Sequence, residues 1–179
     1  MQYHVQPLSL DTFGEPLHDF PGITASVCNL RPTSRGSVTL ASPDIDDPPL
    51  IDPAYLTTDD DRAIAARAIR HARSLADAPA FRSVVIGEYL PGTDAQTDDE
   101  LAEAAGRIAT SIFHPVGTCK MGPAADRMAV VDERLRVHGV PGLRVVDASI
   151  MPRITSGNTN SPVIMIAERA SDLILEDTA

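Results

Sequence analysis

The sequence has no tryptophan, and aromatic residues make up only 4% of its 179 residues. Stacking platforms for nucleic-acid bases and aromatic cages for cations need several such rings, so neither is predicted here. Basic residues are also scarce, since 15 Lys and Arg stand against 25 Asp and Glu and the formal net charge is -10. This balance argues against non-specific binding to nucleic acid or to anionic membrane surfaces.

Cysteines and long apolar runs are scarce as well. Cys28 and Cys119 lie far apart, and we interpret them as reduced thiols of a cytoplasmic protein. No apolar run reaches the length of a membrane span, and the first residues lack the basic and apolar parts of a signal peptide. None of His71, His114, Cys119 and His138 forms a paired ligand motif, so no metal site is predicted.

The residues that are present predict a globular α/β chain. The composition is 43% hydrophobic and 22% charged, and the length suits one domain or part of a larger one. Helical spacing of apolar residues follows an acidic cap at residues 58–61, and it appears again after Thr97 and Glu100, which have capping-box spacing. The second helix is expected to reach Ile112. The arginines of the first helix are interpreted as a solvated face: Arg62, Arg67, Arg70 and Arg73.

Short strands are predicted around these helices. Residues 23–30 and 37–40 have strand-like patterns on either side of a turn, which suggests a hairpin-like pair. The acidic, proline-rich stretch 43–53 predicts a surface loop with an edge strand. Near the end of the chain, a stronger strand is predicted over residues 143–147, ending at the carboxylate of Asp147.

One stretch, FHPVGTCKMG at residues 113–122, places a titratable side chain among residues that fix the backbone. Pro115 disfavours the helical region for His114, and Gly117 and Gly122 bracket a polar segment. Histidine is the commonest general base, but most single histidines are structural. From the spacing alone, both roles of His114 stay open.

A helix is predicted to begin near Pro162, because proline suits the first helical position and Asn160 or Ser161 suits the cap. Its first turns are apolar on nearly every side, so we expect it to be buried. The start of a helix presents free amides and a partial positive charge. Either an electron-rich group or self-capping by Asn160 would satisfy that end.

Several stretches resemble a known family in their order and spacing: FHPVGTCKMG, VVDERLRVHGVPGLRVVDASIMP, SGNTNSPVIMIAERASDLI and, near the start, NLRPTSRGSVTL. The family is the glucose–methanol–choline (GMC) oxidoreductases, and the resemblance is closest to their choline-dehydrogenase-like members. It implies an α/β (α+β) fold. After a connecting segment, residues 1–27, residues 28–112 would form part of the substrate-domain sheet with its helices. Residues 113–179 would supply the active-site loop and the last strand and helix of the FAD domain.

The resemblance also implies roles for two catalytic residues. His114 matches the family's active-site histidine, which takes the proton of the substrate hydroxyl while a hydride leaves the carbon for flavin N5. Asn158 falls at the second active-site position, where its amide can hydrogen-bond the substrate oxygen and orient it.

Five further residues match parts of the family that approach the cofactor. Asp147 and Ala148 match the segment near the ribityl–pyrophosphate portion of FAD. Asn160, Ser161 and Pro162 fall where the final helix points at the pyrimidine side of the flavin ring. A helix start there would stabilise the negative charge that arrives with the hydride.

The sequence departs from the family in one respect. A flavin enzyme of this type needs a G-x-G-x-x-G turn, and none of the 11 glycines has that spacing. We therefore expect the C-terminal portion of an FAD-dependent alcohol dehydrogenase or oxidase. It would act on a small alcohol and be inactive without the N-terminal FAD-binding portion as its partner. The alternative is a non-catalytic fragment that serves as an interaction or substrate-binding module, or half of a split enzyme.

Overall fold

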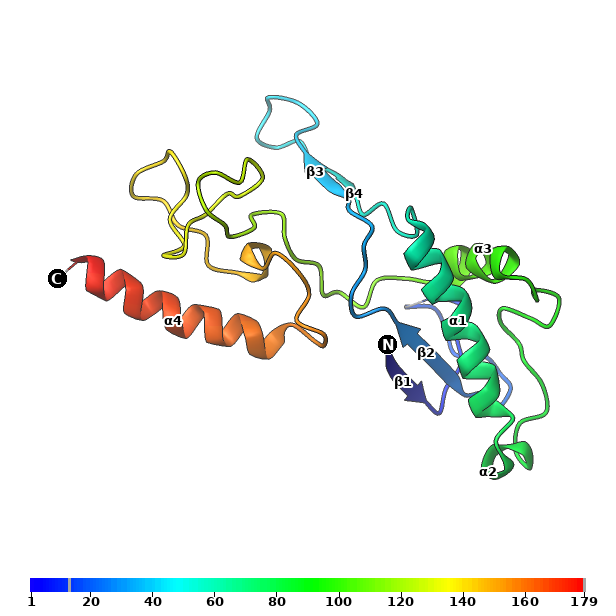
Figure 1. Ribbon diagram of the computed structural model, residues 1–179. Helices are drawn as coiled ribbons and strands as arrows, with labels where there is room; N and C mark the ends of the chain where they lie inside the picture. The colour runs from blue at the N-terminus through cyan, green and yellow to red at the C-terminus, as the bar shows by residue number, and fades with distance from the viewer. Residues whose placement is uncertain (13, 179) are drawn as a thin grey trace. The chain divides into compact units, whose positions relative to one another are not determined.

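The computed structural model describes residues 1–12 and 14–178, and it divides the chain into two compact units, Met1–Thr110 and Ser111–Ala179 (Figure 1). Helices and short strands give the mixed α/β character that was predicted. Residues 1–27, expected as a connecting segment, contain a strand of the first unit. The assignment of residues 28–112 to a substrate domain and of 113–179 to an FAD domain stays a prediction.

The strands of the first unit pair differently from the prediction. Strand β1 (Gln2–Gln6) pairs antiparallel with β2 (Thr24–Cys28), and β3 (Ser37–Thr39) pairs antiparallel with β4 (Leu50–Asp52). The hairpin expected between residues 23–30 and 37–40 is therefore wrong, whereas the strand expected within 43–53 is confirmed as β4.

The reason for the wrong pairing lies in the segment between β2 and β3. The carboxylate of Asp61 accepts hydrogen bonds from Asn29 Nδ2 at 3.0 Å, from the Thr33 amide at 3.0 Å and from the Ser34 amide at 2.8 Å. Burial raises the pKa of Asp61, but the bonds from Ser34 and Thr33 outweigh it and hold this pKa below its ordinary value. The segment is thus bound to the start of a helix and does not form a turn.

The helices of the first unit begin where the caps predict. Helix α1 (Asp59–Ala76) is capped by Thr58, and α3 (Asp98–Ile108) begins with the predicted capping box of Thr97 and Glu100. A short helix, α2 (Pro79–Arg82), lies between them in sequence. Helix α3 ends at Ile108 rather than Ile112, and Ser111 beyond its end accepts a local hydrogen bond from the Phe113 amide, which competes with helix. Buried alanines and Leu101 pack α1 against α3.

The interpretation of a solvated face on α1 holds for Arg67 and Arg70, which are exposed, and is wrong for Arg73, whose side chain is 21% exposed. Arg73 pairs with both carboxylate oxygens of Glu88, at 2.8 and 3.0 Å, and donates to the Gly92 and Ala95 carbonyls. Arg70 donates to the Gln96 carbonyl at 2.9 Å. These bonds fasten residues 88–96 to α1, because a guanidinium presents several donors at once.

The second unit is built around α4 (Asn160–Thr178) and a short 3-10 helix, η1 (Ala148–Ile150). Its core gathers side chains from both helices and from the loops before them: Val131, Leu135, Ile150, Met151, Ile166, Ala170 and Leu173. The strand predicted over residues 143–147 is wrong, since this region forms single bridges such as Arg136 with Arg144. Gly139 and Gly142 turn the chain with positive φ angles and leave no straight run for a ladder.

Helix α4 has one buried face, along Ile166, Ala170 and Leu173. The expectation that this helix is buried is confirmed for that face and wrong for the rest within this chain, because Ile164 and Leu175 are 56% and 68% exposed. No helix in the described part of the chain combines the length and the hydropathy that a membrane span requires.

Candidate active site

The second unit brings together the two residues that were predicted to be catalytic. His114 Nε2 lies 2.7 Å from Asn158 Nδ2, although the two residues are 44 apart in sequence. The other ring nitrogen, His114 Nδ1, lies 2.9 Å from Thr159 Oγ1. Thr159 is buried, His114 is half-buried and Asn158 is exposed, so the cluster runs from the protein interior to the surface.

The backbone before and after His114 is held by specific contacts. Phe113 has a φ of 63°, in the left-handed region that few non-glycine residues adopt, and its amide donates to Ser111 Oγ at 2.9 Å. Gly117 has a φ of 94° and lies so close to Met151 that a Cβ would stand 3.4 Å from the Met151 carbonyl. The sharp turns at both positions present the imidazole as a fixed group.

The loop that follows His114 is bonded to η1. The Cys119 amide donates to the Ser149 carbonyl at 3.0 Å, and the Met121 amide donates to the Ile150 carbonyl at 2.7 Å. Since Ile150 belongs to the core, these bonds tie the histidine loop to the same packed centre that holds α4.

Asn158 and Thr159 owe their positions to the start of α4. The Thr159 carbonyl accepts from the Val163 amide at 3.0 Å, so Thr159 stands at the cap position, immediately before the helix. Val163 packs on the core of the second unit. The packing of α4 therefore fixes the two side chains that meet His114.

The residues predicted to approach the cofactor lie on two helix starts of the second unit. Asp147 precedes η1 and its Oδ1 accepts from the Ser149 amide at 2.7 Å, while Ala148 is the first residue of η1. The others form the first turn of α4, where Asn160 and Ser161 are exposed and Pro162 is half-buried. That first turn holds no acidic residue, so its partial positive charge is available to an electron-rich group. Contacts of these five residues with FAD stay predictions.

Polar residues in and after the stretch FHPVGTCKMG hold the loops of the second unit together. Lys120 Nζ lies 2.7 Å from Asp126 Oδ2, and this bond lowers the pKa of Asp126. His138 is half-buried and its Nε2 lies 3.1 Å from the Gly122 carbonyl, so it ties two loops together. Among the described residues, no group of His, Cys, Asp and Glu has the geometry of a metal site.

Sequence reasoning missed Thr159. The prediction that Asn160 or Ser161 caps the last helix is wrong, because the helix begins at Asn160 and Thr159 directly precedes it. A threonine in that place is usually an N-cap, which suggests a role in the helix rather than in the site. The signal that was available is its position beside Asn158 in the stretch SGNTNSP.

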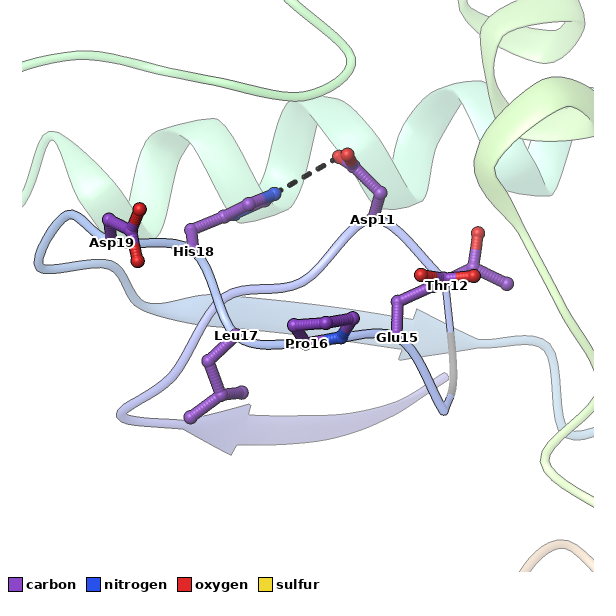
Figure 2. A pocket seen from close by; sticks show the side chains of 7 residues that line it. All are labelled: Asp11, Thr12, Glu15, Pro16, Leu17, His18 and Asp19. Carbon is purple, nitrogen blue, oxygen red and sulfur yellow. Dashed lines mark ion pairs between the residues drawn. The ribbon is translucent and has the colours of Figure 1, made fainter.

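A hollow of about 470 Å³ lies in the first unit, on the connection from β1 to β2 (Figure 2). Its lining comes from one short stretch: Asp11, Thr12, Glu15, Pro16, Leu17, His18 and Asp19. His18 Nε2 lies 3.3 Å from Asp11 Oδ1, and the His18 ring stacks on Phe20 with centroids 4.7 Å apart. None of the predicted site residues lines this hollow, and its histidine is held by packing and by an ion pair.

Comparison with known proteins decides the family. The GMC oxidoreductase profile for the C-terminal part of these enzymes matches residues 32–167. The chain belongs to the GMC oxidoreductase family. Members of this family depend on FAD, and the GMC resemblance of the sequence motifs is thereby confirmed.

The relatives of this GMC chain are oxidoreductases about three times as long. It is 44% identical over 178 residues to the oxygen-dependent choline dehydrogenase of Brucella ovis. The aligned residues make up 99% of this chain and 32% of the relative. It is 42% identical over 175 residues to an alcohol dehydrogenase (acceptor) of Pseudomonas putida, covering 98% of this chain and 31% of the relative. The chain thus spans about a third of the length of the curated relatives it matches.

Solved structures share the fold. Pyridoxine 4-oxidase from Mesorbium loti is 40% identical, with a TM-score of 0.74 over 80% of this chain and 28% of that chain. Formate oxidase from Aspergillus oryzae RIB40 is 29% identical, with a TM-score of 0.82 over 93% of this chain and 29% of that chain. The mixed α/β fold predicted for the C-terminal part of a GMC oxidoreductase is confirmed.

Proposed function

We propose that this chain is the catalytic C-terminal portion of an FAD-dependent oxidoreductase that oxidises a primary or secondary alcohol. The observation that carries the proposal is the 2.7 Å contact between His114 Nε2 and the Asn158 amide, made by the two residues for which the family resemblance implies catalysis. The relatives named choline dehydrogenase and alcohol dehydrogenase support the class of substrate.

The residues of the cluster divide the proton chemistry between them. The Asn158 amide donates toward His114 Nε2, so this nitrogen presents its lone pair to the exposed side of the cluster. A substrate hydroxyl that enters here replaces the amide as the donor to Nε2, and its oxygen accepts a hydrogen bond from the displaced Asn158 amide. His114 takes the proton as the substrate carbon loses a hydride, and the C–O bond becomes a carbonyl. When bound, FAD supplies the hydride acceptor, N5 of the flavin.

The start of α4 fits the electron-rich edge of a flavin ring. Its first turn has no acidic residue, and Asn160 and Ser161 are exposed directly after Asn158 and Thr159. Helix amides and the partial positive charge of the helix start stabilise negative charge placed before them. Asp147 and Ala148 would lie along the ribityl–pyrophosphate portion of FAD. The pyrophosphate also needs a glycine-rich turn, which has to come from residues outside these 179.

The test is to express these residues from their own locus together with the flanking coding sequence. The purified protein is expected to be yellow, and to reduce a dye or oxygen when given choline or a simple primary alcohol. A chimera in which this chain replaces the matching third of the Brucella ovis enzyme gives a second, independent preparation. The 179 residues alone are expected to be colourless and inactive.

Two results would contradict the proposal. One is a flavin-free protein from both preparations. The other is full alcohol turnover in a His114→Ala variant, which would remove the histidine from the chemistry.

A further inference from the structure

We propose that Thr159 is a positioning residue that accepts the Nδ1 hydrogen of His114, so that its hydroxyl holds the imidazole in place and stabilises the ring after it takes the substrate proton. This inference rests on the proposed function and adds a residue to it. It begins from the 2.9 Å contact between Thr159 Oγ1 and His114 Nδ1.

The donors and acceptors of the cluster assign the hydrogen positions. An amide nitrogen can only donate, so Asn158 Nδ2, 2.7 Å from His114 Nε2, requires a lone pair on Nε2. A neutral imidazole with a lone pair on Nε2 carries its hydrogen on Nδ1. That hydrogen points to Thr159 Oγ1, which accepts it. The Asn158 amide therefore selects the tautomer, and the Thr159 hydroxyl rotates to accept the resulting Nδ1 hydrogen.

In the described part of the chain, three threonines stand directly before helices, and Thr159 differs from the other two. The hydroxyl of Thr58 accepts from the Asp61 amide at 3.3 Å, and that of Thr97 accepts from the Glu100 amide at 3.3 Å. Both are ordinary N-caps. The Thr159 hydroxyl instead meets His114, which lies outside the helix. The cap position of α4 thus places a hydroxyl on the histidine.

The hydroxyl is held firmly enough for this role. Thr159 is 6% exposed, and its carbonyl is already part of α4 through the Val163 amide at 3.0 Å. A β-branched side chain also has few χ1 choices. Burial, helix and side-chain shape together keep Oγ1 opposite the imidazole.

The bond to Thr159 becomes stronger when His114 takes the substrate proton. The imidazolium donates from both nitrogens, and a hydrogen bond from a charged donor is roughly twice as strong as a neutral one. Loss of the hydroxyl therefore weakens the state that follows proton transfer more than it weakens substrate binding. We expect kcat to fall roughly ten- to a hundredfold in Thr159→Val, with little change in KM.

The experiment compares Thr159→Val and Thr159→Ser in the FAD-loaded enzyme. Thr178→Val is the matched control, because Thr178 lies at the other end of α4, where its hydroxyl bonds the Ile174 and Leu175 carbonyls at 3.1 Å. Three quantities are measured: bound flavin by its absorbance, kcat and KM with the same alcohol, and the imidazole ¹⁵N shifts of His114. The shifts are assigned by difference from His114→Ala in protein labelled with ¹⁵N-histidine.

The expected result is a wild-type His114 with its neutral hydrogen on Nδ1, a lower kcat and a His114 that is harder to protonate in Thr159→Val, as its ¹⁵N shifts followed against pH report, and recovery of both in Thr159→Ser. Thr178→Val is expected to match the wild type. A wild-type His114 with its hydrogen on Nε2 overturns the inference, even if Thr159→Val fails to fold. So does a Thr159→Val variant with wild-type turnover. If His114→Ala is itself fully active, the proposed function fails, which is a distinguishable outcome.

Discussion

The two ends of α4 are built from different chemistry. At its start, Thr159 and Asn158 meet His114 through hydrogen bonds between uncharged groups, and the first turn has no acidic residue. At its end, Arg134 Nη2 donates to the Leu173 carbonyl at 3.3 Å and to Asp177 Oδ1 at 2.6 Å. One end of the helix carries the candidate site, and the other carries paired charges.

The difference shows how one helix can serve both stability and chemistry. The carbonyl end of a helix bears a partial negative charge, and arginines there satisfy it within the protein. Arg134 and Arg144 both form ion pairs with Asp177 at this end, so the charged groups at the end of the helix already have partners within the protein. The amide end keeps its partial positive charge for a ligand. Changes at the start of α4 should therefore alter turnover, and changes in its body or at its end should alter the free energy of unfolding.

The largest effect is expected for His114→Ala. Removing a positioned general base lowers turnover by about 10²–10⁴-fold. Steady-state turnover with an alcohol and a dye acceptor measures this loss, and flavin absorbance shows whether the cofactor stays bound. If the variant instead unfolds and the turnover of its folded fraction is unchanged, the claim that the start of α4 serves catalysis rather than stability is contradicted.

A smaller loss is expected for Asn158→Ala. Its amide donates toward the point where the substrate oxygen sits in the proposed reaction, and loss of one such donor costs roughly a hundredfold in kcat. The measurement is kcat at saturating alcohol, with the unfolding midpoint in urea as a control for stability. An unchanged kcat would show that Asn158 does not hydrogen-bond the substrate oxygen during the reaction, and His114 would then act without it.

Leu173→Ala should reverse this pattern. Leu173 is 4% exposed in the core of the second unit, and truncation of a buried leucine costs about 2–5 kcal/mol of unfolding free energy. Leu173→Met keeps the volume and should cost less than about 1.5 kcal/mol. Urea unfolding measures both variants, and kcat per bound flavin should stay at the wild-type value. A large fall in kcat at constant stability would show that the two functions of α4 are not separable.

The smallest effect concerns pH and Asp177. Hydrogen bonds from Arg134 and Arg144 hold the pKa of Asp177 below its ordinary value. This carboxylate therefore adds stability above its unfolded pKa of about 3.9, and that stability disappears as the pH falls through the lower folded pKa. Asp177→Asn should lower the unfolding midpoint at neutral pH, and the two proteins should converge in acid. A difference that is independent of pH would argue against the ion pairs as its source.

Local patterns were sufficient to predict the parts of the fold that depend on neighbouring residues. The capping box of Thr97 and Glu100 was predicted because its partners are three residues apart. Strand pairing depends on distant groups, and the hairpin prediction failed because the Asp61 carboxylate binds the segment that would have formed the turn. Burial of α4 also depends on what covers it, and the core of the second unit covers one side only.

The candidate site could be predicted in part. The approach of His114 to Asn158 came from the family resemblance, because spacing alone left His114 open to a structural role. Thr159 could not be predicted, since a threonine before a helix has the same sequence signature whether it caps the helix or bonds a histidine. Thr58, Thr97 and Thr159 look alike in sequence and differ only in the group that the fold brings to their hydroxyls.

The most direct test is the rate of flavin reduction in a single turnover, measured by anaerobic rapid mixing of the FAD-loaded enzyme with alcohol. The wild type, His114→Ala and Arg134→Met are compared, so that both ends of α4 are changed in one experiment. We predict that His114→Ala slows flavin reduction by about a hundredfold or more, and that Arg134→Met reduces its flavin at the wild-type rate. Equal rates in the wild type and His114→Ala would contradict the assignment of His114 as the proton acceptor.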